Sequence, residues 1–271
     1  MTKENEMPEL PEVTIFKEYF DSTSLHREIK DVTVSNEFVL KDISVNQFQN
    51  KLKGQQFDST ERRGKYLFIE VSPEKFYLLL HFGMTGSLSY YKSTGDQPDY
   101  ARIIIDFKNG FHLSYNSQRM LGEIRLLDNM QEYIEEHKIG RDAMDKALTE
   151  EAFKKLLDHR KGIVKSVLMN QEVISGIGNE FSDEILFHAK IHPKTKIQDL
   201  SDTELHKIYK QMKEVLQTAI DHRTNYGELK DSFLLANREK EGKCPNCHSK
   251  LETIQVSGRT AYYCPKCQST G

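Results

Sequence analysis

The sequence predicts an α+β multidomain protein in which an N-terminal helix leads into a β-sandwich, a helical domain follows, and a cysteine-bracketed β-hairpin ends the chain. Three observations carry this prediction. Residues 31–127 contain short β-branched and aromatic runs separated by turn signals, and apolar residues recur at helical spacing after about residue 130. All four cysteines lie after residue 243. We place the three domains at residues 7–128, 129–235 and 236–271.

The first element is a helix expected over residues 9–23. Its apolar residues recur at i, i+3 and i+7, which is the spacing of one helical face. Pro8 would stand at the helix start, where its missing N–H leaves no partner unsatisfied. Glu9 and Glu12 would lie near the positive end of the helix dipole. The local pattern therefore describes Pro8 as an ordinary helix-start proline.

Seven short runs predict the strands of the sandwich: residues 32–40, 65–71, 76–82, 87–91, 101–107, 111–115 and 124–127. Turn signals at 93–96 and 108–110 separate some of them, and many short strands at this spacing are typical of a β-sandwich. The helical domain is predicted from four segments with helical apolar spacing: residues 149–159, 162–171, 179–189 and 201–222. Residues 223–243 are expected to form a polar connector.

Composition and charge limit the function classes. No apolar run approaches the roughly 18 residues of a membrane helix. The leader MTKENE has no apolar core, so a secretory signal is excluded and a cytoplasmic location is expected. The net charge of −3 argues against wholesale coating of nucleic acid, yet basic residues outnumber acidic ones after residue 150. This asymmetry is compatible with a local anion-binding face.

The cysteines form two C-x2-C pairs, Cys244 with Cys247 and Cys264 with Cys267. Four thiolates at this spacing can converge tetrahedrally on one Zn²⁺ ion, and the residues between the pairs suit a β-hairpin. The alternatives are two disulfides or four buried thiols, although a cytosolic chain disfavours disulfides. A site closed by four cysteines is structural rather than catalytic. His248 is expected to be a surface residue and not a ligand.

The hairpin between the cysteine pairs carries Arg259 directly after Gly258, at its expected tip. A lone turn arginine is usually solvated. A rigid zinc hairpin is, however, also a good support for a guanidinium that binds phosphate. The residues alone leave both interpretations open.

The segment 170–193 contains Gly176 and Gly178, followed by Asn179 and an amphipathic run. This pattern predicts a tight turn into a helix N-terminus, where free backbone N–H groups and the helix dipole make an anion site. The alternative is a plain packing motif in which Gly178 is needed only for a positive φ angle. The composition favours neither.

Five segments in this order resemble one protein family. They are MPELPEV (7–13), RRGKYLFIEV (62–71), HFGMTGSL (81–88), GIGNEFSDEILF (176–187) and the cysteine unit from CPNC to GRTAYYCPKCQ (244–268). Together they resemble the bacterial formamidopyrimidine-DNA glycosylase / endonuclease VIII family of base-excision repair enzymes. The resemblance implies a β-sandwich, a helix–two-turn–helix domain and a zinc finger, in agreement with the fold predicted above.

The resemblance also implies an activity. Members of this family flip a damaged base out of the duplex, attack the sugar C1′ with an N-terminal proline amine, and cleave the strand by β- and usually δ-elimination. By resemblance, Pro8 is the Schiff-base nucleophile and Glu9 the proton donor beside it. Lys65 would contact phosphate and serve β-elimination, and Arg259 would contact phosphate and assist δ-elimination.

The DNA-binding residues carried over from the family form two groups. Met84 and Arg119 match residues that enter the gap left by the flipped base. The second group matches residues that hold backbone phosphates: Arg160, Gly176, Gly178 and Asn179. The partner implied is double-stranded damaged DNA, bound in the cytoplasm, at the nucleoid, by a monomer. One structural Zn²⁺ ion is expected, with no small-molecule cofactor and no membrane.

The chain departs from the family pattern at several positions. Arg119 is kept, but Leu121 replaces an aromatic wedge, and a leucine can still fill an unstacked base step. A family histidine falls at Tyr100, which we therefore include among the DNA-binding residues. Residues 225–242 are short for the glycine-rich loop that covers an everted oxidised purine, so oxidised pyrimidines or a broader substrate range stay open.

The leader raises a chemical question about Pro8. If translation starts at Met1, the Pro8 nitrogen lies in a tertiary amide and cannot form a Schiff base. Translation from Met7 with removal of that methionine, clipping of the leader, or substitution by another amine such as Lys65 would restore an amine. Three functions therefore compete: a glycosylase with lyase activity, a family member that binds damaged or structured DNA without chemistry, and an RNA-binding protein, which leaves PELPEV unexplained.

Overall fold

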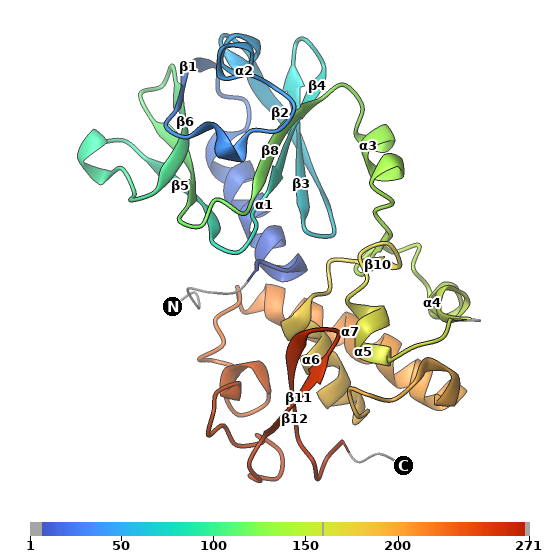
Figure 1. Cartoon of the computed structure of the whole chain (residues 1–271). Helices are drawn as coiled ribbons and strands as arrows, with labels where there is room; N and C mark the ends of the chain where they lie inside the picture. The colour runs from blue at the N-terminus through green and yellow to red at the C-terminus, as the bar shows by residue number, and fades with distance from the viewer. Residues whose placement is uncertain (1–6, 159, 269–271) are drawn as a thin grey trace. The chain divides into compact units, whose positions relative to one another are not determined.

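The computed structural model describes residues 7–158 and 160–268 and divides the chain into two units (Figure 1). The first unit contains Met7, Pro8 and residues 12–137, and the second contains Glu9–Pro11 and residues 138–268. The unit boundary falls within helix α1 (Leu10–Ser24), whose first two residues group with the second unit. The leader MTKENE lies outside the described residues. The question whether translation starts at Met1 or at Met7 concerns these residues.

Two antiparallel four-stranded sheets form the first unit. One has the strand order β1 (Ile29–Val34), β6 (Ala101–Phe107), β7 (His112–Ser117), β5 (Gly86–Tyr91). The other has the order β2 (Gln56–Arg63), β3 (Tyr66–Ser72), β4 (Phe76–His81), β8 (Glu123–Leu127). The unit also contains α2 (Val45–Leu52), α3 (Met130–Glu136) and the short 3-10 helices η1 (Glu37–Val39) and η2 (Thr94–Asp96).

One apolar core lies between these sheets. Successive side chains of a strand point to opposite faces, so only one face of each strand can reach the core. The core joins both sheets and one face of α1: Val13, Phe20, Leu67, Ile69, Ile103, Ile105 and Phe107 are among its buried residues. The predicted β-sandwich with a preceding helix is confirmed, and it supports the loops that carry several of the predicted site residues.

Some elements of this unit differ from the expectation. Strand β2 has the sequence QFDSTERR, in which Phe57 is the buried side chain, so it lacks a clear apolar pattern and is recognised by its pairing with β3. The run 32–40 is not one strand. β1 ends at Val34, and the side chain of Asn36 accepts a hydrogen bond from the Phe38 N–H (2.9 Å), which caps η1.

The second unit is mostly helical and ends in a hairpin. Its elements are β9 (Arg141–Asp142), α4 (Glu150–Leu157), α5 (Val164–Leu168), β10 (Ile174–Ser175), α6 (Asn179–Ala189), η3 (Ile197–Asp199), α7 (Asp202–Asp221), η4 (Leu235–Asn237), β11 (Glu252–Val256) and β12 (Arg259–Tyr263). Helices α5 and α6, with the turns of residues 169–178 between them, form the expected helix–two-turn–helix. No helix in the described ranges, the 20-residue α7 included, has the length and apolarity needed to cross a membrane.

The segment 223–243 is not the polar connector that its composition suggests. Its apolar side chains are buried: Leu229, Phe233, Leu234 and Leu235. Glu184 of α6 accepts hydrogen bonds from the backbone N–H groups of Leu234 (3.0 Å) and Leu235 (2.7 Å). A buried carboxylate therefore anchors the start of η4, and the segment packs against the helical core.

Candidate functional site

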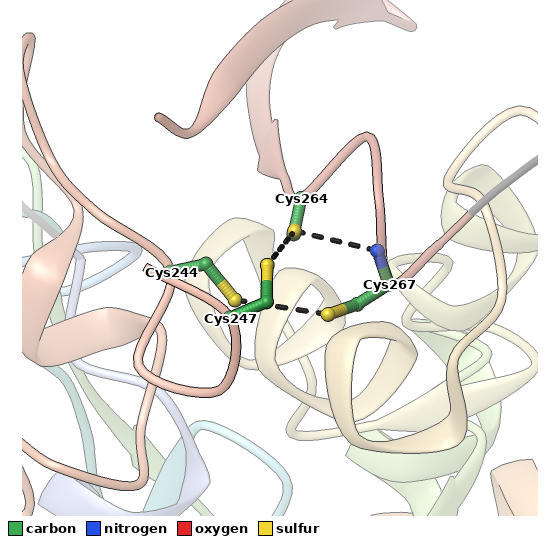
Figure 2. A group of neighbouring side chains, drawn as sticks. All are labelled: Cys244, Cys247, Cys264 and Cys267. Carbon is green, nitrogen blue, oxygen red and sulfur yellow. Dashed lines mark hydrogen bonds between the residues drawn. The ribbon is translucent and has the colours of Figure 1, made fainter. Parts of the chain in front are cut away.

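The four cysteines lie together at the open end of the hairpin β11–β12 (Figure 2). Their sulfur atoms are all within 4.8 Å of one another, with 3.5 Å between Cys247 and Cys264 and 3.8 Å between Cys244 and Cys267. A disulfide needs about 2.05 Å, so the disulfide alternative is wrong. Four sulfurs at about 2.3 Å from one zinc ion would be about 3.8 Å apart, which this cluster fits. His248 is exposed and stands outside the cluster, as expected.

The turn of this hairpin places Arg259. Ser257 (φ 50°) and Gly258 (φ 74°) both have positive φ angles, as the two central residues of a type I′ turn must. Arg259 is the next residue, paired with Val256 in the hairpin register, and its side chain is exposed. The hydroxyl of Ser257 is 2.7 Å from the hydroxyl of Ser166 in α5, so the turn is also tied to the helical core.

Among the described residues, the second edge of β12 is covered by side chains and not by another strand. Asn179 donates its Nδ2 hydrogen to the Thr260 carbonyl oxygen (3.2 Å), and Asp183 accepts the Tyr262 N–H on Oδ2 (3.0 Å). Asn179 and Asp183 are one turn apart in α6, so both project from the same face of that helix. The hairpin is thus registered against α6 by hydrogen bonds on either side of Ala261.

Glu9 occupies the N-terminus of α6. Its carboxylate oxygens accept hydrogen bonds from the backbone N–H groups of Gly178, Glu180 (2.9 Å) and Phe181 (3.4 Å), and the residue is 3% exposed. From the sequence we expected this charge to interact with the dipole of the helix that follows it, α1. The carboxylate instead lies at the positive end of the α6 dipole. The backbone N–H groups at this turn therefore bind a negative charge, and that charge is the carboxylate of Glu9.

The turn before α6 depends on Gly176. Its φ angle is +109°, whereas that of Gly178 is −123°, so the positive φ expected at Gly178 belongs to Gly176. A Cβ atom at position 176 would lie 2.6 Å from Cδ1 of Leu10, and the Gly176 carbonyl accepts the Leu10 N–H (3.0 Å). Leu10 therefore binds to the same turn as Glu9 does.

In the first unit, Lys65 lies in the two-residue turn between β2 and β3 and is 7% exposed. His81, at the end of β4, is opposite Tyr66 in one sheet partner and opposite Glu123 in the other. Burial lowers the pKa of His81, the negative charge of Glu123 opposes this shift, and the positive charge of Lys65 reinforces it. A cation and a histidine thus share one electrostatic environment at this end of the sandwich.

Four predicted DNA-binding residues lie on loops of the first unit that contact one another. Met84 precedes Thr85, whose hydroxyl accepts the Arg119 N–H (3.1 Å). The Ser117 N–H donates to the Tyr100 carbonyl (3.0 Å), so the loop 117–122 is joined to the loop of Tyr100 as well. Tyr100 (51% exposed) and Leu121 (53% exposed) are among the most exposed large apolar side chains of the described residues.

Gly83 lies where a side chain would collide with the loop 117–122, which supports a stability test. A Cβ atom there would lie 2.3 Å from the Gly122 nitrogen and 2.6 Å from the Leu121 oxygen, at a φ angle of +60°. Gly83→Ala is therefore expected to lower the free energy of unfolding by about 2 kcal/mol or more. The matched control is Gly110→Ala, where φ is +81° but nothing lies within 4 Å, and about 1 kcal/mol is expected from the φ angle alone. Equal losses in the two variants, measured by urea unfolding, would contradict this account of the loop contact.

Backbone strain accumulates at the same loops. Tyr100 (φ 62°) and Met120 (φ 52°) both have left-handed backbone angles, which cost residues with a Cβ about 1 kcal/mol each. Arg102 supports Tyr100, because its guanidinium lies 5.5 Å from the Tyr100 ring centroid while its Nε donates to the Ser117 carbonyl (2.7 Å). Strain that the surrounding structure maintains is characteristic of functional loops.

The remaining predicted residues are separate from these groups. Arg160 is exposed after α4, with its Nε donating to the Leu156 carbonyl (2.6 Å). Pro8 is half-buried and belongs to the first unit with Lys65, while Glu9 and Arg259 belong to the second. The structure thus brings Glu9, the glycine turn and the hairpin together in one unit, and the exposed loop residues together in the other.

Comparison with known proteins identifies the family. The formamidopyrimidine-DNA glycosylase N-terminal domain model matches residues 7–124, and the H2TH (helix–two-turn–helix) domain model of the same enzyme matches residues 139–229. A transcription factor zinc-finger model matches residues 243–268. The formamidopyrimidine-DNA glycosylase of Pelotomaculum thermopropionicum is 30% identical over 279 residues, which cover 97% of this chain and 99% of the relative. The chain belongs to the formamidopyrimidine-DNA glycosylase family.

Other members of the formamidopyrimidine-DNA glycosylase family extend the comparison. The Arabidopsis thaliana enzyme of that name is also 30% identical, over 97% of this chain and 71% of its own length. The Lactococcus lactis enzyme bound to DNA with an abasic site has a TM-score of 0.87 and 27% identity, covering 97% of this chain and all of that one. The same enzyme in complex with an oxidised-pyrimidine DNA has a TM-score of 0.88 and 25% identity. The predicted fold and family are confirmed.

One charged cluster near the site of this formamidopyrimidine-DNA glycosylase was not predicted from the sequence. Lys165 of α5 is fully buried, and its Nζ donates to the Asn179 carbonyl (2.7 Å), the Ser182 hydroxyl (2.8 Å) and Asp183 Oδ1 (2.6 Å). Burial lowers the pKa of Lys165 and raises that of Asp183, while their mutual attraction opposes both shifts. A lysine within the apolar run GIVKSVLM was the available signal.

Proposed function

We propose that this chain excises oxidised bases from duplex DNA and then cleaves the strand at the abasic site, with the Pro8 nitrogen as nucleophile. The broader activity comes with the family: the chain is a DNA glycosylase and abasic-site lyase of base-excision repair. The observation that supports the residue assignment is the placement of Glu9. It follows Pro8 directly, and three backbone N–H groups hold its carboxylate.

The chemistry begins with the lone pair of a free Pro8 amine. A proline at a chain terminus is a secondary amine with a pKa below that of lysine, so more of it is unprotonated at neutral pH. The nitrogen attacks C1′, and the glycosidic bond breaks with its electron pair on the base, which takes up a proton. Opening of the sugar ring then gives an iminium ion, loss of the C2′ proton expels the 3′-phosphate, and a second elimination expels the 5′-phosphate.

The charged residues serve these proton and phosphate steps. We assign proton transfer to Glu9, because a positioned carboxyl group can give up a proton in one step and take one back in the next. Lys65 and Arg259 would bind the phosphates flanking the lesion, and thereby assist the β- and δ-elimination steps respectively. A guanidinium suits the second task since it binds phosphate through two parallel hydrogen bonds.

Recognition requires base flipping, because C1′ is shielded inside the duplex. We propose that Met84, Arg119 and Leu121 enter the gap left by the flipped base and that Tyr100 contacts the DNA beside them. Arg160 and Asn179 would hold backbone phosphates. Since Glu9 takes the Gly178 N–H, Gly178 and Gly176 would shape that turn and not bind phosphate through this N–H group.

The proposal also includes a partner and a location. The partner is double-stranded damaged DNA, as in the L. lactis complexes with formamidopyrimidine and abasic-site DNA. We propose a monomer that acts at the nucleoid in the cytoplasm. The steps above use amine, carboxylate and cationic side chains, so they require no small-molecule cofactor.

The lesion class is open to a direct test. The L. lactis enzyme has been crystallised with both a formamidopyrimidine and an oxidised pyrimidine in DNA. We propose that this chain accepts both classes, with the short segment 225–242 favouring the pyrimidines. Base release from duplexes carrying one oxidised purine, one oxidised pyrimidine or no lesion, measured with protein that begins at Pro8, tests this. No release from any lesion duplex would refute the proposed activity.

Zinc removal gives a second test. The four cysteines would hold one Zn²⁺ ion whose chemistry is structural, because all four positions are filled by thiolates. Chelation is expected to loosen the hairpin that carries Arg259 and to weaken binding to abasic-analogue DNA about tenfold, since a phosphate contact is lost. The β-sandwich has its own core, so it should stay folded by circular dichroism. Readdition of Zn²⁺ is the control, and an unchanged affinity in zinc-free protein would contradict the expectation.

A second function is favoured by one observation, the six residues that precede Met7. With the leader attached, the Pro8 nitrogen is an amide, and the protein would bind damaged or structured DNA without cleaving it. Salt-dependent binding without base release by the full 271-residue chain, alongside activity of the form that begins at Pro8, would assign this state to the extended protein.

A further inference from the structure

A buried ionic cluster joins α5, α6, η4 and the zinc hairpin in the second unit. We define it as the α6 ion cluster, and its members are Lys165, Glu180, Asp183 and Arg238. Both charged side chains at its centre, Lys165 and Asp183, are inaccessible to solvent, and the Arg238 side chain is 4% exposed. The charges of two cations and two carboxylates balance, as burial requires.

Arg238 has the widest set of contacts in the cluster. Its Nη1 is 2.9 Å from Glu180 Oε1, and its Nη2 is 3.4 Å from Asp183 Oδ2. The same Nη2 donates to the Thr260 carbonyl (3.2 Å), and the guanidinium lies 5.0 Å from the ring centroid of Tyr262. One side chain that follows η4 therefore touches both α6 and strand β12.

The contacts of Arg238 with β12 lie next to Arg259. Thr260 is the neighbour of Arg259, and its carbonyl is shared by Arg238 and Asn179. The backbone immediately after Arg259 is thus held by two side-chain donors, the buried Arg238 guanidinium and the half-buried Asn179 amide, whereas the Arg259 side chain itself is exposed. Movement of Arg238 would release one of the two side-chain hydrogen bonds to the Thr260 carbonyl, next to the hairpin tip.

The other end of the cluster reaches Glu9. Glu180, the partner of Arg238, donates its backbone N–H to the Glu9 carboxylate (2.9 Å). The side chain and the backbone of one residue therefore connect the Arg238 guanidinium to the proposed acid–base group. The Glu9 carboxylate and the Arg259 hairpin therefore both contact the first turn of α6, and this turn fixes the position of each.

A buried ion cluster is a poor way to gain stability. The desolvation of the charges offsets most of their attraction, and well-packed apolar residues are often as stable or more so. What such a cluster supplies is geometry, because guanidinium and carboxylate groups meet only in a few orientations. Its position between two functional elements suits that role.

We infer that Arg238 is a positioning residue of this enzyme, which holds the Arg259 hairpin in register with α6 through Glu180, Asp183 and the Thr260 carbonyl. The inference rests on the proposed function, in which Arg259 binds a phosphate beside the lesion. Arg238 touches no DNA in this scheme. It acts through Arg259, and its removal has no consequence for cleavage once Arg259 is gone.

A double-mutant cycle tests this dependence. Four proteins that begin at Pro8 are compared: the parent, Arg238→Met, Arg259→Ala and the double variant. Single-turnover cleavage of an abasic-site duplex and the affinity for a duplex with a tetrahydrofuran site are measured. Each single substitution is expected to lower cleavage about tenfold, and the double variant should be no slower than Arg259→Ala. Losses that multiply would mean that Arg238 stabilises the fold in general, and would overturn the inference.

Two further variants keep the test decisive. Glu180→Gln removes the charge that orients Arg238 while keeping the side-chain shape. It replaces Arg238→Met in the double-mutant cycle if that variant loses zinc or fails to fold. The matched control is Lys250→Gln, which breaks an exposed ion pair of the same module (Lys250 to Glu241, 2.9 Å) and should leave cleavage unchanged. A parent protein that does not cleave would refute the proposed function, whereas an active parent with an additive cycle would refute the role of Arg238 alone.

Discussion

Protein that begins at Pro8 is expected to form a covalent complex with an abasic-site duplex under borohydride, and the 271-residue chain is expected to form at least about 1,000-fold less. The cause lies in one nitrogen. At the chain terminus it is a secondary amine with a lone pair, and its attack on C1′ gives an iminium ion that borohydride reduces to a stable amine. Behind Met7 the same nitrogen is part of an amide and has no lone pair to donate.

Trapping is measured by gel electrophoresis of labelled duplex at several times, with the two forms at equal concentration. A form that begins at Met7 is the matched control, since it adds a single residue and should trap as poorly as the full chain. Substituting Lys65→Arg in the form that begins at Pro8 removes the alternative amine, and should keep the trapped product. Equal trapping by the extended and the shortened forms would show that another amine attacks, and would remove Pro8 from the mechanism.

How far the sequence predicts this site depends on the range of the interactions involved. The zinc ligands are predictable because their signal is local: two C-x2-C pairs flank one hairpin. Helix α6 is equally local, since its apolar spacing and the glycines before it define residues 179–189. Strand β2 is the opposite case, because its polar sequence makes sense only beside β3.

Long-range pairing accounts for what the sequence could not show. The carboxylate of Glu9 meets a helix that starts 170 residues later in the chain, so local reasoning assigned its charge to α1. Arg238 and Glu180 are 58 residues apart in the chain, and no local motif connects them. A charged residue in a polar segment carries no mark of burial until its partner is known, so within the α6 ion cluster only Lys165, in its apolar run, could have been noticed from the sequence.

Glu9→Gln is expected to slow base excision about 100-fold or more while changing the affinity for an abasic-analogue duplex by less than about threefold. The substitution removes the group that transfers protons. Glu9 lies at a helix N-terminus, however, and its replacement removes no cation that binds DNA. Loss of a negative charge near phosphate would, if anything, favour binding. Excision is measured in single-turnover experiments, and binding by fluorescence anisotropy in the same buffer.

The structure adds a consequence for stability. The Glu9 carboxylate accepts N–H groups from Gly178, Glu180 and Phe181, and an amide offers one oxygen where the carboxylate offers two. The NH₂ group of a glutamine would face a backbone donor, so Glu9→Gln should also cost about 1–3 kcal/mol of unfolding free energy. Glu172→Gln, an exposed change in the turn before α6, is the matched control and should alter neither quantity. Comparable losses of excision and of DNA affinity in Glu9→Gln would mean that Glu9 only supports the fold of the α6 turn, because a structural defect there would weaken both together.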